Sequence, residues 1–154
     1  MPTNTRPTLG KFVAAECLQQ MRLHVEDLAG PGPVLGAGRM RGAGLVELLG
    51  KTGASPSIDD ATEILQKALG LDGTRLAIVD DITEDNGTYT VRIHEGACSF
   101  DRKSDEPMCA YTLGVFVGAI GGLYGATMTG KELECEAMGD SQCVYRIKRH
   151  IALD

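Results

Sequence analysis

The chain has 154 residues, of which 43% are hydrophobic, and this is enough for one globular domain whose buried core does not depend on disulfides. The formal net charge is −6, and the acidic residues are dispersed except for a cluster around residues 80–85. Phosphate binding needs clustered Lys and Arg, so the composition argues against nucleic acid as a direct partner. We expect residues 1–7 to form a flexible tail and residues 8–154 to form the single domain.

Three helices are predicted in the first half of the chain. Apolar residues at helical spacing indicate a helix over 9–28, with Cys17 on its buried side. The Gly-Pro-Gly-Pro segment at 30–33 ends this helix. A second helix is predicted over 39–50, and a third lies between a serine cap at position 57 and a glycine stop at position 70.

Two strands follow, over 75–82 and 88–95, and the turn between them contains an Asn-Gly pair. Within the second strand, Tyr89, Val91 and Ile93 alternate with polar residues, which predicts one buried face and one polar face. Segregated helices and strands predict the α+β class, with the N-terminal helices packed on an antiparallel sheet.

Residues 108–130 contain no charged side chain, but glycines and threonines lower their hydropathy, so we expect a buried helix and not a membrane span. Gly114, Gly118 and Gly122 line one face of this helix. Each glycine costs about 1 kcal/mol of helix propensity relative to alanine, so a close approach on that face should offset the cost. A packed strand, a dimer partner, a bound ligand and tight helix packing all remain open.

The last elements are two predicted strands, 131–138 and 142–149, which form a hairpin. This hairpin brings Cys135 nearly opposite Cys143. With Cys109 and Glu132, these residues would offer three thiolates and one carboxylate, which suit Zn²⁺ and close a tetrahedral shell, as in a structural site.

Glu132 and Cys135 are an odd number of positions apart and would point to opposite faces of an ideal strand, so the site needs a bend or bulge after Gly130. The alternatives are buried thiols or a disulfide between Cys135 and Cys143. Cys98 is the reserve ligand if Glu132 does not bind the metal. The start of the chain does not read as a signal peptide, so we expect a reducing, cytoplasmic location, where disulfides are rare.

Catalytic motifs are scarce. The three histidines are scattered, and no serine or cysteine lies in a nucleophile motif, so we expect a non-enzymatic protein. The glycines at 36, 38 and 42 are similar to a dinucleotide-binding loop, but their spacing is off by one and no clear strand precedes them.

The run from Cys109 through the Gly-rich helix to Glu132-Leu-Glu-Cys135 and Gly139-Asp-Ser-Gln-Cys143 resembles the 4-vinyl reductase domain family. This family includes the sensor domains of phenol- and toluene-responsive transcriptional activators. In those sensors a Cys, a Glu and two later Cys hold a structural zinc, in the order found here. The resemblance implies the α+β fold of the TRAPP (Golgi transport-particle) and NO-signalling ligand-binding type, and a homodimer.

We therefore expect a domain that binds a small apolar ligand, such as an aromatic hydrocarbon, a lipid-like molecule or a tetrapyrrole. The alternatives are a dimeric scaffold and a carrier or accessory subunit in tetrapyrrole vinyl reduction. The candidate ligand-binding residues come from the Gly-rich helix and the second strand: Phe116, Ile120, Tyr124, Tyr89, Val91, Ile93 and His94.

Overall fold

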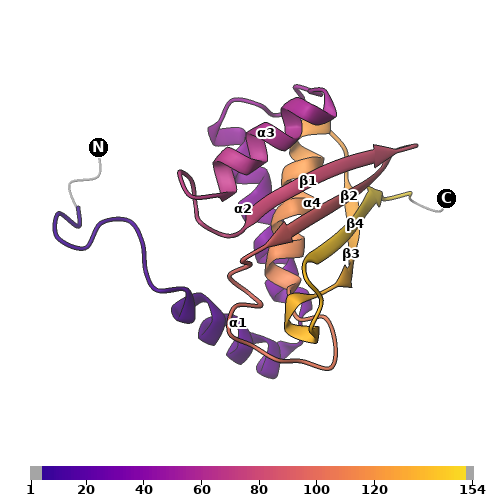
Figure 1. The fold of residues 1–154 in the computed structure, drawn as a ribbon. Helices are drawn as coiled ribbons and strands as arrows, with labels where there is room; N and C mark the ends of the chain where they lie inside the picture. Colours follow the sequence, from indigo (N-terminus) through magenta and orange to yellow (C-terminus); the bar gives the residue numbers. More distant parts are fainter. Residues whose placement is uncertain (1–4, 152–154) are drawn as a thin grey trace.

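The computed structural model describes residues 5–151, so residues 1–4 of the predicted tail lie outside the described part. In chain order, the elements are helices α1 (Ala15–Ala29), α2 (Gly32–Leu48) and α3 (Ile58–Leu69), strands β1 (Ile78–Asp85) and β2 (Thr88–His94), helix α4 (Ala110–Tyr124), strand β3 (Met128–Glu134), the short 3-10 turn η1 (Glu136–Met138) and strand β4 (Cys143–Arg149). This order confirms the predicted α+β class (Figure 1).

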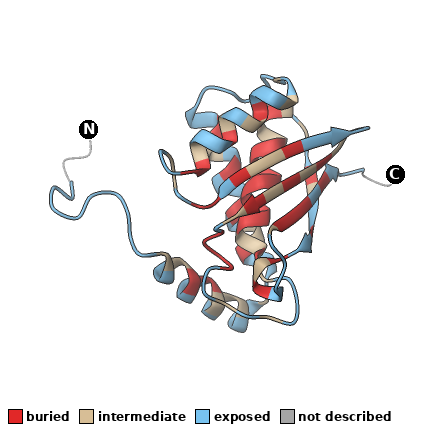
Figure 2. Cartoon of the chain, in the orientation of Figure 1, coloured by how far each residue is buried: buried red, intermediate tan, exposed pale blue. Residues whose placement is uncertain are grey.

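The four strands form one antiparallel sheet in the order β1-β2-β4-β3. Helix α4 covers one face of this sheet, and α2 lies beyond α4 (Figure 1). The inner face of the sheet and α4 supply the centre of the core, shown in red in Figure 2, and its fully buried side chains include Val91, Ile93, Tyr145, Ile147, Phe116 and Ile120. The C-terminal hairpin is therefore attached directly to the core.

Local sequence signals explain several boundaries. The Ser57 hydroxyl accepts a hydrogen bond from the backbone N–H of Asp60 at 3.1 Å, which caps α3 as predicted. Asn86 and Gly87 both have left-handed backbone angles, with φ of 50° and 79°, as a tight hairpin turn between β1 and β2 requires. The third helix and the first hairpin thus agree with the sequence prediction.

The prediction for the first helix was wrong in its start and in its buried side. Helix α1 begins at Ala15, and Cys17 is exposed. The buried residues of α1 are Gln19 and Arg22, whereas its apolar residues Met21 and Leu28 are 59% and 88% exposed. Hydrogen bonds account for this arrangement, because the Gln19 and Arg22 side chains donate to backbone carbonyls of the loop that follows β2.

Helix α2 starts seven residues earlier than predicted, at Gly32. The Gly-Pro segment ends α1 at Gly30, whose φ is 76°, and then begins α2, because a proline in the first helical turn lacks only an N–H that would have no helical partner. The predicted third strand also ends early: residues 136–138 form η1 and not strand.

The glycines of α2 and α4 face one another. A Cβ on Gly118 would lie 2.0 Å from the backbone oxygen of Arg39, and a Cβ on Gly42 would lie 2.0 Å from that of Val115. Gly38 and Gly114 make equivalent contacts. Tight helix packing is therefore the reason for the glycine face of α4. Within the described residues, no helix combines the length and the apolar character needed to cross a membrane.

Candidate metal centre

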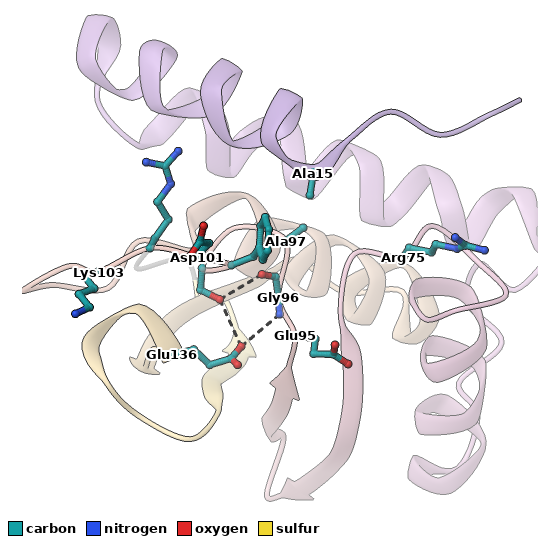
Figure 3. Close-up of a pocket in the computed structure, with 11 residues that line it drawn as sticks. Ala15, Arg75, Glu95, Gly96, Ala97, Asp101, Lys103 and Glu136 are labelled. Atoms are coloured by element: carbon teal, nitrogen blue, oxygen red, sulfur yellow. Dashed lines mark hydrogen bonds between the residues drawn. The ribbon is translucent and has the colours of Figure 1, made fainter. Parts of the chain in front are cut away.

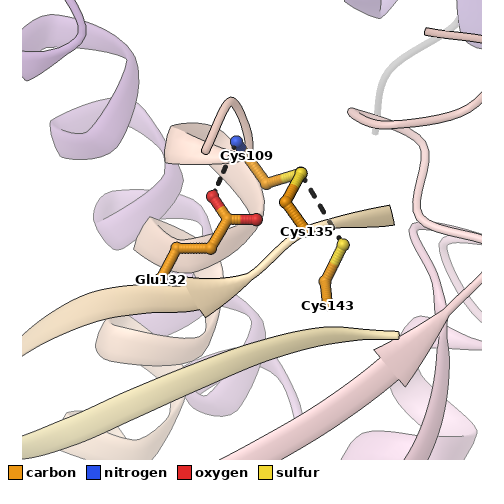
Figure 4. A group of neighbouring side chains, drawn as sticks. All are labelled: Cys109, Glu132, Cys135 and Cys143. Atoms are coloured by element: carbon orange, nitrogen blue, oxygen red, sulfur yellow. Dashed lines mark hydrogen bonds between the residues drawn. The ribbon is translucent and has the colours of Figure 1, made fainter. Parts of the chain in front are cut away.

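Three segments bring the four predicted metal ligands together (Figure 4). Cys109 precedes the first residue of α4, Glu132 lies in β3, Cys135 directly follows β3, and Cys143 begins β4. One ligand atom from each side chain lies within 4.8 Å of the others, and all four residues are buried. A buried group of this kind must be either protonated or compensated by a positive charge.

The sulfur separations fit a tetrahedral zinc site. The Sγ of Cys109 lies 3.8 Å from that of Cys135 and 4.0 Å from that of Cys143. Zn–S bonds of about 2.3 Å in a tetrahedron place two sulfurs about 3.8 Å apart. All three cysteines are free thiols in this structure.

A β-bulge solves the problem of the odd spacing. Glu132 pairs with Tyr145 and Glu134 pairs with Val144, so Leu133 is an extra residue in β3. The bulge lets Glu132 and Cys135 turn to the same side of the strand. This is the irregularity after Gly130 that the sequence requires.

Backbone groups hold the ligands in place. The N–H of Cys109 donates to Glu132 Oε2 at 3.0 Å, and the N–H of Glu136 donates to Cys143 Sγ at 3.3 Å. The Asp140 carboxylate accepts from the N–H of Cys135 at 2.9 Å and closes the η1 turn. N–H donors aimed at thiolate and carboxylate favour their ionised, metal-binding forms.

The electrostatics of the group favour a cation. Burial raises the pKa of Glu132 to about 7, and its Oε1 is buried without a hydrogen-bond partner among the described residues. Hydrogen bonding to Cys135 and Cys143 raises the pKa of Cys109, whereas the hydrogen bond from Cys109 lowers the pKa of Cys135. A divalent ion would let all four groups ionise and would give Glu132 Oε1 a partner. The donor set fits zinc.

The reserve ligand Cys98 lies outside this group of four. Its Sγ accepts a hydrogen bond from the Thr112 hydroxyl at 3.1 Å, and burial raises the pKa of its thiol. Its backbone carbonyl accepts from Arg22 at 2.6 Å. Cys98 therefore links α1 to the start of α4.

Six of the seven candidate ligand-binding residues lie on the helix-covered side of the sheet. Four of them, Val91, Ile93, Phe116 and Ile120, are at most 1% exposed in the hydrophobic core. Tyr89 and Tyr124 stack with ring centroids 5.2 Å apart. His94 belongs to the opposite, polar face, where its Nδ1 lies 2.7 Å from Asp80 Oδ1. The structure thus separates His94 from the other six.

A surface hollow of about 730 Å³ lies between the start of α1, the loop after β2 and η1 (Figure 3). Ala15 and Ala97 face each other across it, and Arg75, Asp101 and Glu136 contribute charged side chains. The sequence analysis missed this hollow because loop residues form most of its wall. Gln19 and Arg22, two polar residues within an apolar helical pattern, were the available signal that α1 packs against polar backbone.

The fold and the buried cluster together define a small α+β domain with a candidate metal centre between its Gly-rich helix and its C-terminal hairpin. The family model of the 4-vinyl reductase domain matches residues 90–149, which include all four clustered residues, and this confirms the resemblance to that family. No curated protein matches the sequence significantly.

Solved structures share the fold. The phenol-responsive sensory domain of the transcription activator PoxR, with phenol, has a TM-score of 0.70 at 18% identity, over 90% of this chain and 76% of that one. A vinyl-4-reductase family protein from Methanocaldococcus jannaschii has a TM-score of 0.61 at 15% identity, over 93% and 85%. A trafficking protein particle complex subunit 3 from Naegleria fowleri, covalently bound to palmitic acid, has a TM-score of 0.59 at 18% identity, over 91% and 97%. At these identities the likeness concerns the fold.

Proposed function

We propose that this chain is a non-catalytic, cytoplasmic ligand-binding domain that holds one structural Zn²⁺ through Cys109, Glu132, Cys135 and Cys143. The observation that carries the proposal is the buried cluster of three thiols and one carboxylate within the segment that the family model matches. With four protein ligands the zinc shell has no open position for a substrate water, which favours a structural role. The ion would join the start of α4 to the bulge of β3 and the start of β4.

The proposed ligand is small and apolar. Support comes from the fold shared with the phenol-responsive domain of PoxR and with the palmitate-bound trafficking subunit. The six inward-facing candidate residues already pack against one another in the core. A ligand at that position would have to displace these contacts, whereas a hollow beside the core would admit one at lower cost.

A dimeric scaffold is the second candidate function, and the exposed apolar side chains of the first two helices favour it. Met21 and Leu28 of α1 and Met40 and Leu48 of α2 are each more than half exposed. Apolar side chains gathered on one part of a surface are typical of a protein interface. A homodimer is compatible with both functions.

Metal analysis tests the zinc proposal. Freshly purified protein should contain close to one zinc per chain, and Cys143→Ser should lose it because the tetrahedral shell then lacks one thiolate. Cys98→Ser is the matched control, since Cys98 is equally buried but lies outside the group of four, and it should retain the zinc. Chelation should also lower the melting temperature of the wild type. A wild type purified without metal, with all five thiols titratable, would contradict the proposal.

Ligand binding is tested separately, by thermal shift with aromatics, fatty acids and porphyrins on the zinc-loaded protein. A true ligand should stabilise the fold by about 2.7 kcal/mol at a hundredfold excess over its dissociation constant. If none of these compounds shifts the melting temperature, the scaffold becomes the better proposal.

A further inference from the structure

The large hollow of Figure 3 continues beneath the N-terminal part of α1. A second hollow of about 460 Å³ shares Ala15, Arg75 and Ala97 with it, and a third of about 130 Å³ shares Leu18, Thr74 and Leu76 with the second. We call the second and third hollows together the α1 groove. The inner end of the groove reaches the core at Leu69, Tyr111 and Val115.

Helix α1 is held at one end and forms a roof at the other. Gln19 and Arg22 anchor it to the backbone carbonyls of Phe100 and Cys98. The segment 11–15, by contrast, lines the groove, and two of its side chains, Phe12 and Val13, are 48% and 65% exposed. Exposed apolar side chains in the wall of a hollow are the surface that an apolar ligand would cover.

Polar groups of the groove indicate the chemistry of the ligand. The Thr74 hydroxyl is buried and has no hydrogen-bond partner among the described residues, which costs about 1–3 kcal/mol unless something bonds to it. Lys11, Arg41 and Arg75 belong to the lining of the groove, and no Asp or Glu does among the described residues. The groove therefore combines an apolar wall with positive charge and one unpaired donor.

We propose that the α1 groove binds a hydrophobic carboxylic acid, with α1 as its lid. The carboxylate pairs with Arg75 and accepts the Thr74 hydroxyl hydrogen. The apolar body passes beneath Leu18 into the inner hollow, whose volume is close to the roughly 150 Å³ of a cavity that holds one benzene. This inference rests on the proposed function and specifies the ligand class and the site.

Calorimetry on the zinc-loaded full chain with decanoate and decanol tests the proposal. Decanoate should bind, and decanol should bind at least about tenfold more weakly, because it offers no charge to Arg75. Thr74→Val should weaken decanoate about tenfold while leaving decanol nearly unchanged. Equal binding of the two compounds to the wild type would overturn the carboxylate assignment.

Leu18→Trp should fill the groove and abolish binding. Leu28→Trp is the matched control, because it adds the same side chain to α1 at a residue that is 88% exposed, and it should bind decanoate as the wild type does. Zinc content and melting temperature establish that each variant is folded. If Leu18→Trp is not folded, the Thr74→Val result decides.

The outcomes separate this inference from the proposed function. If apolar compounds bind the wild type and bind the folded Leu18→Trp and Thr74→Val variants equally well, the ligand site lies elsewhere, and only the groove inference fails. If no apolar compound binds the wild type, both fail.

Discussion

Glu132 is the member of the metal cluster whose charge depends most simply on its surroundings. One carboxylate oxygen accepts the N–H of Cys109, the other is buried without a partner among the described residues, and burial raises the pKa to about 7. A metal ion would reverse this preference, because the ionised carboxylate would then be the bound form.

We predict that chelated and zinc-loaded protein respond to pH in opposite directions between about pH 5 and 7. In the chelated protein, the folded state binds the Glu132 proton more tightly than the unfolded state does, so unfolding free energy falls as pH rises through this range, by at most about 3 kcal/mol. In the zinc-loaded protein, ligand ionisation strengthens metal binding, so stability rises with pH. Urea unfolding at a series of pH values measures both slopes.

Glu132→Gln is the control for the chelated protein, since it keeps the size of the side chain but removes the titration. Its unfolding free energy should depend less on pH over the same range. A chelated wild type whose stability rises between pH 5 and 7 would mean that another group dominates.

At the residue scale, the sequence was informative about the cluster and misleading about α1. The order of Cys109, Glu132, Cys135 and Cys143, together with the family resemblance, was sufficient to identify a group that lies together in the structure. The burial of Arg22 was not predictable from periodicity, because it depends on a carbonyl 76 residues away in the sequence. Apolar spacing gives the faces of a helix but not the side on which its partner lies.

At the scale of elements, the contact between α2 and α4 is made by backbone against backbone. We predict that Gly118→Ala will lower the free energy of unfolding by about 1–3 kcal/mol or more, because the added methyl group would lie 2.0 Å from the backbone oxygen of Arg39 and would push the helices apart. Thermal or urea unfolding measures the change.

Gly44→Ala is the matched control within α2. No atom lies within 4 Å of a Cβ at this position, so the substitution should stabilise the helix by about 0.5–1 kcal/mol through propensity alone. If both substitutions stabilise the protein, the two helices are not packed as closely as described.

Element types were more predictable than element ends. The Ser57 cap, the Asn86-Gly87 turn and the alternation of β2 all have local causes, and these elements agree with the structure. The start of α2 within a Gly-Pro segment and the η1 turn depend on tertiary contacts. The partner of the glycine face also stayed open, since the glycines of α2 had been considered only as a phosphate loop.

At the scale of the whole molecule, we predict a homodimer. Sedimentation at micromolar concentration should give about twice the 16.3 kDa chain mass, because the exposed apolar residues of α1 and α2 lose contact with water on association. The double substitution Met21→Glu and Leu28→Glu should shift the protein toward the monomer while leaving its zinc content unchanged.

Lys148→Glu is a control on the polar face of the sheet, away from these helices, and should leave the mass of the particle unchanged. A wild type that sediments as a monomer at every concentration would contradict the dimer and remove the main support for the scaffold.

The bulge at Leu133 makes the number of residues in this segment matter more than their identity. Leu133 and Glu134 are exposed, so other side chains fit there, and exchanges should accumulate with little effect on the cluster. Loss or gain of one residue between Glu132 and Cys135 is different, because it shifts the strand by one position and turns Cys135 to the opposite face. The segment should therefore accept point substitutions but reject single-codon deletions and insertions.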